Sequence, residues 1–318
     1  MNKKMAIDRI EEQRLWKEAH PKVRGYLLEL MDNVAFQDGR AWDTRTGEEV
    51  THLVDVGLKT TDKQVRRLKE KDELSKHEKE NGGFIFAFFK QLTTMQERFP
   101  SLTKQDTARL MYIATYTNYE DNRLQSDNGK RHYNKKDLEK LVKMSTKRFN
   151  EFFKRLEQEN IIEEAESGEI YINPTVFYRG ELRNHEYDIS DLSYTRMFKK
   201  TVRDLYAEFK GRRLGQLSVI YAVLPYVNFS TNIVCHNPEE TSEELIKPME
   251  LGELSKLLGY SDAHKLKRAL NNIKIDGKPV FGFFENPHDR RTMRIVINPS
   301  VVFAGNGEQL EAIKVLFN

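Results

Sequence analysis

Two stretches of this 318-residue chain match each other, in the same order, at three places. Near the end of each stretch stands Ile-Asn-Pro, at residues 172–174 and 297–299, followed by an apolar run and a glycine at 180 or 305. Further upstream, residues 137–142 match residues 253–258, and residues 111–119 match residues 220–229. Ordered matches of this kind indicate a structural unit that occurs twice, which constrains the fold more than composition does. The sequence therefore predicts a duplicated domain.

Each stretch has the residue pattern of helices followed by a hairpin. In the first stretch, apolar residues at helical spacing predict helices over 84–95 and 103–116, a short helix after Asn134 and a longer one after Ser145. Residues 161–162 and 170–172 favour strands, with Gly168 at the turn between them. Short helix, tight turn, longer helix and two-stranded wing is the order of a winged helix-turn-helix. The second stretch repeats this order, with helices expected near 198–209, 217–227, 251–258 and 262–273 and strands at 280–284 and 293–297.

The expected fold class is therefore mainly α (α+β), with two tandem winged helix-turn-helix domains and a small α/β N-terminal region. The two domains are expected at residues 81–182 and 194–306. Residues 1–80 are expected to contain a helix, a hairpin around Gly47 and a charged linker. The tail, residues 307–318, is expected to be helical, either as a docking or dimerisation helix or as a helix packed on its own domain.

Composition and charge limit the classes of function. No apolar run approaches the ~18 residues of a membrane span, and the charged residues that follow Met1 do not resemble a secretion signal. Cys235 is the single cysteine, so no internal disulfide can form and a buried, unreactive thiol is expected. We therefore expect a cytoplasmic protein that makes no membrane contact. The net charge of +3 and the pI of about 8.6 permit nucleic-acid binding without requiring it. Such binding depends on whether positive residues cluster on one face of the protein.

Several motifs resemble those of the small plasmid replication proteins of Gram-positive bacteria, the firmicute RepL-type family. The similarity covers roughly residues 40–180. It comprises Asp-x-x-x-Gly-Glu at 43–48, Gly-x-Phe at 82–84, Gln-Leu at 91–92, Leu-Glu-Gln-Glu-Asn-Ile-Ile at 156–162, Asn-Pro at 173–174 and Arg-Gly at 179–180. The resemblance implies a winged-helix module that binds plasmid DNA and initiates replication. In this chain the module would be duplicated and preceded by a longer N-terminal region.

The longer helix after each tight turn is the expected recognition helix, because a helix fits the major groove of DNA. Lysine and arginine suit phosphates and guanine, and asparagine suits adenine. In the first stretch, the expected DNA contacts are Thr146, Lys147, Arg148, Asn150 and Lys154, together with Lys135 and Lys136 on the short helix. In the second stretch, they are His264, Lys265, Lys267, Arg268 and Asn271. The alternative is that these are ordinary solvated helix positions.

The two predicted hairpins differ in charge. The first contains four glutamates, which a phosphate backbone repels: Glu163, Glu164, Glu166 and Glu169. The second contains Arg290, Arg291 and Arg294. We therefore expect the second hairpin, and not the first, to contact the DNA backbone or the minor groove.

The sequence offers little for catalysis. The eight histidines never form the His-hydrophobic-His pair that a metal-dependent nicking initiator uses. The sequence also lacks the Gly-x-x-x-x-Gly-Lys-Ser/Thr loop of ATPases, and neither Gly-x-Ser-x-Gly nor His-Glu-x-x-His occurs. We therefore expect a protein that is not an enzyme, with no catalytic residues, metal or cofactor.

These observations predict a sequence-specific protein for double-stranded DNA that initiates replication of a plasmid or phage at its origin. Two unlike recognition helices in one chain could read half-sites about 34–36 Å apart, with the protein acting as a monomeric pseudo-dimer or as a homodimer. Host replication or transcription proteins are the expected further partners. One alternative is a transcriptional regulator of a mobile element, and another is an adaptor that binds host RNA polymerase or a replisome subunit. A nuclease is the last alternative.

Overall fold

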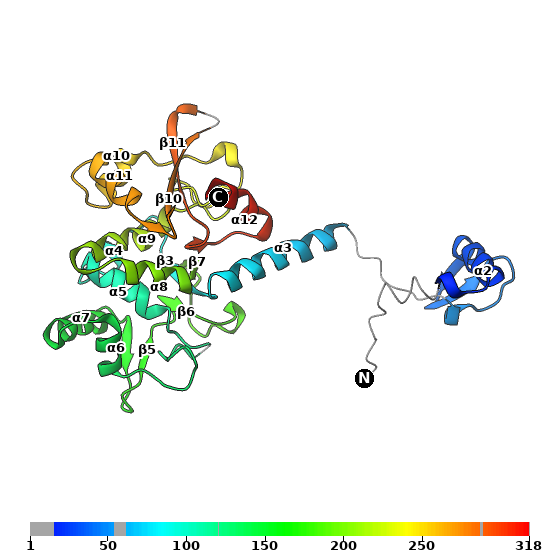
Figure 1. Ribbon diagram of the computed structural model, residues 1–318, viewed down its shortest axis with the longest axis horizontal. Helices are drawn as coiled ribbons and strands as arrows, with labels where there is room; N and C mark the ends of the chain where they lie inside the picture. Colours follow the sequence, from blue (N-terminus) through cyan, green and yellow to red (C-terminus); the bar gives the residue numbers. More distant parts are fainter. Residues whose placement is uncertain (1–15, 54–61, 120, 287–288, 318) are drawn as a thin grey trace. The chain divides into compact units, whose positions relative to one another are not determined.

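The computed structural model describes residues 16–53, 62–119, 121–286 and 289–317, and Figure 1 shows its elements. Within these ranges, the side chains of residues 62–64, 184, 211–212, 286 and 289–292 are not described. The chain divides into two compact units, Met1–Lys63 and Gln64–Asn318. Each unit is described below by itself.

In unit 1, the described residues include a helix and a hairpin. Helix α2 (Pro21–Asp32) begins with proline in its first turn, where the missing N–H costs nothing, and the His20 side chain accepts from the Lys22 N–H. Strands β1 (Val34–Gln37) and β2 (Arg40–Asp43) pair antiparallel, and the turn η1 (Thr51–Leu53) follows. The core consists of Leu30, Ala41 and Val50.

A four-stranded antiparallel sheet lies at the centre of unit 2. Its strands are β3 (Phe84–Phe89), β6 (Phe177–Tyr178), β7 (Ser193–Phe198) and β12 (Val302–Phe303), in the order β12-β7-β3-β6. The central pair, β3 and β7, places Ile85 opposite Met197. Two strands therefore come from each of the matching stretches.

The prediction of two tandem winged helix-turn-helix domains is wrong. Residues 64–318 form one compact unit, a mixed α+β structure with several small antiparallel sheets, and both stretches contribute to the same central sheet. The physical reason is that two short strands do not make a stable sheet by themselves. Pairing β3 with β7 gives each stretch the strand partner and the apolar cover that it lacks.

The helix predicted over residues 84–95 is also wrong at its start, because residues 84–89 form strand β3. Phenylalanines at 84, 86, 88 and 89 fit both a helical stripe and a strand that is buried on both faces. In the structure, Ile85, Ala87 and Phe89 belong to the main core, whereas Phe86 and Phe88 face a separate apolar cluster with Tyr178. Burial on both faces therefore explains why this apolar segment forms a strand.

Helices and a hairpin make up the part of the first stretch between β3 and β6. The helices are α4 (Met95–Arg98), α5 (Lys104–Ala114), α6 (Lys135–Val142) and α7 (Thr146–Gln158). The hairpin consists of β4 (Ile162–Glu164) and β5 (Ile170–Ile172), and the turn η2 (Leu182–Asn184) follows β6. Capping boxes at Thr94, Thr103 and Asn134 begin α4, α5 and α6, because each side chain accepts a backbone N–H that the first helical turn leaves unpaired.

The second stretch has a corresponding set of elements. Its helices are α8 (Lys199–Glu208), α9 (Ser218–Ala222), α10 (Leu251–Leu257) and α11 (Ala263–Asn271). Short 3-10 helices form η3 (Gly211–Gln216), η4 (Leu224–Tyr226) and η5 (Glu243–Leu245). The strands are β8 (Lys274–Ile275), β9 (Lys278–Pro279), β10 (Phe281–Asn286) and β11 (Asp289–Ile297).

The two stretches share one buried polar arrangement. Asn122 and Asn232 both adopt left-handed backbone angles, with φ of 56° and 55°. Each side-chain amide donates two hydrogen bonds of 2.7–3.0 Å to buried carbonyl oxygens. The acceptors are Ile172 and Phe177 in the first stretch and Ile297 and Val302 in the second. The same local structure therefore closes both Ile-Asn-Pro segments onto the loop before them.

Helices α3 (Asp62–Glu80) and α12 (Gly307–Lys314) belong to the second stretch's side of unit 2. His77 near the end of α3 is buried, and its Nε2 lies 2.9 Å from the carbonyl oxygen of Pro299. Leu310, Ile313 and Phe317 of the tail are buried in a cluster that includes Cys235. The tail is therefore packed on its own unit, and the expected burial of the Cys235 thiol is confirmed.

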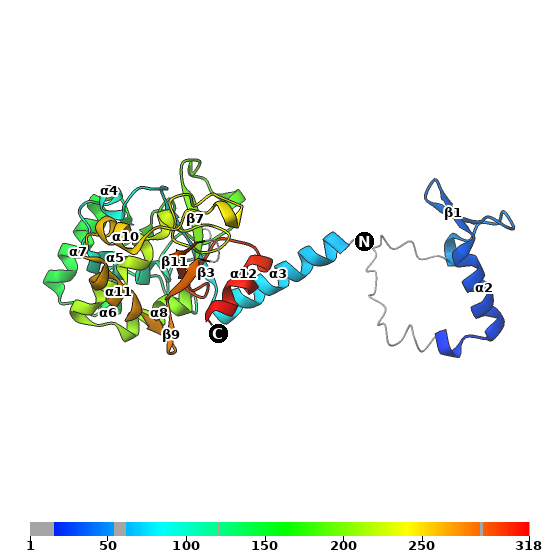
Figure 2. The ribbon, with the colours of Figure 1, turned by 90° about the horizontal axis from the view of Figure 1, so that it is seen from above.

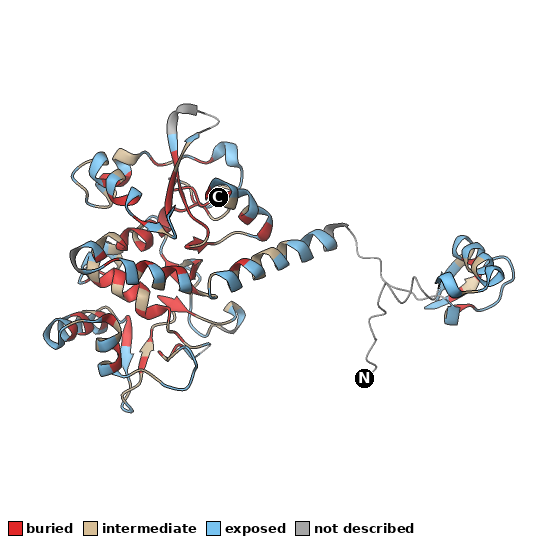
Figure 3. Cartoon of the chain, in the orientation of Figure 1, coloured by how far each residue is buried: buried red, intermediate tan, exposed pale blue. Residues whose placement is uncertain are grey.

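The buried residues of unit 2 gather between the sheet and the helices, while long parts of α3 and α7 remain exposed (Figure 3). Within the part of the chain that the structure describes, no helix combines the length and apolarity of a membrane span.

Candidate nucleic-acid interface

Helix α7 presents a polar, mostly basic face to solvent. Its inner face is aromatic, because Phe149, Phe152, Phe153 and Leu156 recur at helical spacing and are buried. The outer face carries the predicted residues Thr146, Lys147, Arg148, Asn150 and Lys154, and all five are exposed. Glu151 is exposed on the same helix and reduces its net positive charge. The Thr146 hydroxyl donates to Glu139 Oε1 at 2.6 Å, so it joins α6 to α7 as well as facing solvent.

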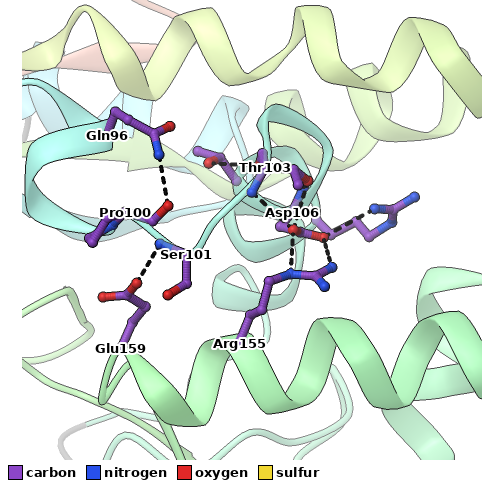
Figure 4. A network of polar contacts seen from close by, with 9 residues as sticks. Gln96, Pro100, Ser101, Thr103, Asp106, Arg155 and Glu159 are labelled. Carbon is purple, nitrogen blue, oxygen red and sulfur yellow. Dashed lines mark hydrogen bonds and ion pairs between the residues drawn. The ribbon is translucent and has the colours of Figure 1, made fainter.

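A buried carboxylate fixes the position of α7. Asp106 in the first turn of α5 accepts from Arg155 of α7 through both oxygens, at 2.9 Å from Nε and 3.2 Å from Nη2 (Figure 4). Asp106 also accepts from the Thr103 hydroxyl at 2.7 Å, and Arg109 lies 3.5 Å away. A second contact, from the Ser101 N–H to Glu159 Oε1 at 2.6 Å, holds the end of the helix. The orientation of α7 is therefore set by α5.

The second exposed helix, α11, follows a turn after α10. Leu266, Ala269 and Leu270 are buried, and Asp262 caps the helix by accepting from the Lys265 N–H at 2.8 Å. The predicted residues His264, Lys265, Arg268 and Asn271 are exposed. Lys267 is half-buried, and its Nζ lies 5.4 Å from the ring centroid of Phe283, so part of its side chain covers the core.

Lys104 connects α5 to the corner between α10 and α11. Its Nζ donates to the carbonyl oxygen of Leu258 at 3.0 Å and lies 4.5 Å from the ring centroid of Tyr260. Burial lowers the pKa of Lys104, in keeping with its position against this corner. The first turn of α5 thus contacts α7 through Asp106 and the turn before α11 through Lys104. Figures 1 and 2 show both α7 and α11 in the part of unit 2 away from α3, and in Figure 1 α5 and α8 lie between them.

The five remaining predicted contact residues are Lys135, Lys136, Arg290, Arg291 and Arg294. Lys135 is half-buried, with its Nζ 4.3 Å from the ring centroid of Phe153, whereas Lys136 is exposed. Arg294 is buried and forms an ion pair with Glu243 at 2.6 Å. Its guanidinium therefore does not face solvent, contrary to the prediction. The side chains of Arg290 and Arg291 lie outside the described residues, although their backbone belongs to β11.

The positions of β11 side chains explain the burial of Arg294. Successive residues of a strand face opposite sides, so Arg294 shares a face with Val296, which packs in the cluster around Cys235. That face meets η5, where Glu243 supplies the compensating charge. Met293, the preceding residue, is exposed instead. Hydrophobicity alone predicts the reverse, with Met293 buried and Arg294 exposed.

Sequence reasoning also missed the residues that position the two helices, namely Lys104, Asp106 and Arg155. Asp106 is recognisable as a capping residue three positions after Thr103. Its partner Arg155 is 49 residues further along, and a pairing at this separation leaves no periodic or motif signal.

The exposed basic faces of α7 and α11 define a candidate nucleic-acid-binding surface. Compared with protein-family models, with curated proteins and with solved structures, the chain matches none of them. The resemblance to the RepL-type family therefore stays a prediction from the sequence.

Proposed function

We propose that this protein binds double-stranded DNA through the exposed faces of α7 and α11. The observation that carries the proposal is that two amphipathic helices of one compact unit both expose basic residues and both lie in its part away from α3 (Figure 2). Lysine and arginine on exposed helices neutralise phosphates, and such helices fit the major groove. Because the two outer faces differ in sequence, the two DNA segments that they contact should differ as well.

We further propose that the bound DNA is an origin of replication on a plasmid or phage. The support for this step is the set of RepL-type motifs at residues 43–48, 156–162, 173–174 and 179–180. Footprinting on the DNA of the host and its mobile elements distinguishes this role from transcriptional regulation. Protection at an origin supports initiation, and protection confined to promoters contradicts it.

The salt dependence of binding tests the DNA proposal directly. The affinity for a duplex of about 30 base pairs, which spans two half-sites one turn apart, is measured by fluorescence anisotropy at several salt concentrations. Each phosphate contact contributes about 0.9 to the slope of log K against log salt. Replacing Lys147, Arg148 and Lys154 together by alanine should therefore flatten the slope by up to about 2.7.

A matched control removes the same charge from the other side of unit 2. Lys69, Lys76 and Lys79 are exposed on α3, so their triple alanine variant loses three positive charges without touching α7 or α11. The control should leave the slope within about 0.5 of the original protein. Equal effects of the two triple variants would mean that binding depends on total charge, and the proposed surface would be wrong.

A further inference from the structure

A cavity of about 680 Å³ lies beside the β4–β5 hairpin. Its walls come from the loop at 121–122, the turn at 160, the hairpin itself, residues 173–174 and the segment 185–187. This volume is within the range of about 300–1,000 Å³ that is typical of ligand sites. The cavity uses none of the residues of the candidate nucleic-acid interface.

The charge around this cavity is negative. Asp121, Glu163 and Glu186 line it, and none of the lining residues that the structure describes is lysine or arginine. Asp121 pairs with Arg123 at 3.0 Å, but the same guanidinium also pairs with Glu169 at 3.0 Å. Glu163 and Glu186 are exposed and have no ion-pair partner within the described ranges. Phosphate groups are therefore repelled here, and a cation is attracted.

Aromatic rings form one wall of the cavity. Tyr178 and His185 meet edge to face with centroids 4.7 Å apart, and His185 and Tyr187 do so at 6.0 Å. His185 is held in place because its Nε2 lies 3.0 Å from the carbonyl oxygen of Pro174. Tyr171 lines the cavity from β5, in register with Glu163 on β4. Rings and carboxylates together are the surroundings that favour ammonium and guanidinium groups.

One buried polar atom at this cavity lacks a partner. Asn122 lines the cavity and is 3% exposed. Its amide nitrogen donates to the carbonyl oxygens of Ile172 and Phe177, whereas its side-chain oxygen has no hydrogen-bond partner in the described structure. A buried acceptor without a donor costs free energy. The wall of the cavity therefore contains one unpaired acceptor.

We propose that this cavity binds an arginine or lysine side chain from a basic segment of a partner protein. The carboxylates of Glu163 and Glu186 attract the cation, the rings of Tyr171 and Tyr187 contact it, and the size of the cavity admits neighbouring residues of the segment. The cavity is open to solvent beside the exposed ring of Tyr187, so a peptide can enter without unfolding the hairpin. The site does not depend on the DNA proposal, and it is assayed without DNA.

The test uses the full chain and a defined peptide, acetyl-Gly-Arg-Gly-Arg-Gly-amide, with a norleucine peptide of the same length as the neutral control. Calorimetry and amide NMR shifts should show saturable binding of the arginine peptide at the residues that line the cavity. Glu163→Gln should weaken binding about 3–5-fold, as expected for one partly exposed charge pair. Tyr187→Ala should weaken it by a similar factor, and Tyr187→Phe should restore it because the ring face remains.

Glu164→Gln is the matched control. Glu164 is exposed and adjacent to Glu163 on β4, but it does not line the cavity, so its replacement should change the affinity less than about 1.5-fold. Equal weakening by Glu164→Gln, equal binding of the norleucine peptide, or no binding of the arginine peptide would overturn the proposal. Competition with spermidine tests a small polyamine as the ligand. If spermidine binds more tightly than the arginine peptide and displaces that peptide fully, the cavity is a polyamine site and the assignment of a protein partner is wrong.

Discussion

Replacing Arg155 by methionine tests how α7 is held. The substitution keeps most of the apolar length of the side chain and removes the guanidinium that bonds to both oxygens of Asp106. Asp106 has a side chain only 2% exposed, while that of Arg155 is 29% exposed. The variant therefore leaves a buried carboxylate without its strongest donor.

The structure sets the expected magnitude. Removing one partner of a fully buried ion pair costs about 3–5 kcal/mol, and a single hydrogen bond to a charged group is worth about 1.5–3 kcal/mol. Asp106 retains the Thr103 hydroxyl at 2.7 Å and the Thr103 N–H at 3.0 Å, and Arg109 stays nearby. Since Arg155 is also partly solvated, we expect the free energy of unfolding to fall by about 2 kcal/mol.

Urea denaturation followed by circular dichroism measures this change. Glu159→Gln is the control on the same helix, because the amide oxygen can still accept from the Ser101 N–H, and its effect should stay within about 0.5 kcal/mol. A double-mutant cycle with Asp106→Asn should give a coupling of about 1–2 kcal/mol. If Arg155→Met changes stability no more than Glu159→Gln does, or if the cycle shows no coupling, the Asp106 contact does not hold α7.

Three further predictions concern buried polar groups. Asn122→Ala and Asn232→Ala should each lower the free energy of unfolding by about 2–4 kcal/mol in denaturant titrations, because two buried carbonyls lose donors and the left-handed backbone disfavours alanine; a change below about 1 kcal/mol in either variant would show that the shared arrangement is not structural. Burial raises the pKa of the Cys235 thiol to about 11, so its labelling by a disulfide reagent at pH 8 should be at least roughly 200-fold slower than that of an unperturbed thiol, and equal rates would contradict its burial. Burial also lowers the pKa of His77, so the unfolded state binds more protons below about pH 6.5 and stability should fall as the pH decreases from there. His77→Gln should remove this component of the pH dependence, and an unchanged profile would refute the assignment to His77.

Local pattern was sufficient for the helices of the candidate interface. Amphipathic spacing and the capping residues Asn134 and Asp262 predict α6 and α11 close to their observed bounds. Four buried apolar residues at helical spacing similarly predict α7 after Ser145. These signals lie within about 15 residues of each other, so no tertiary information is required.

The central sheet could not be predicted in this way. Strand β3 has phenylalanines at spacings that fit both a helix and a strand buried on two sides, and its partner β7 lies about 100 residues later. The position of Arg294 in the candidate site likewise could not be predicted from local sequence. Its charge suggests an exposed hairpin, but the strand register places it against Glu243 of a distant turn. Long-range pairing decides both cases.

The central pairing of β3 with β7 also limits what can be lost from the gene. A reading frame that ended after the first matching stretch would encode β3 without its central neighbour, and the open strand edge would favour aggregation. The connector between β6 and β7 adds to this dependence, because Leu182, Ile189 and Leu192 cover Phe86 and Phe88 on the second face of the sheet. Deletion of either stretch would remove two of the four strands of the central sheet and leave the other two without their partners. The two stretches therefore have to be kept together in the gene.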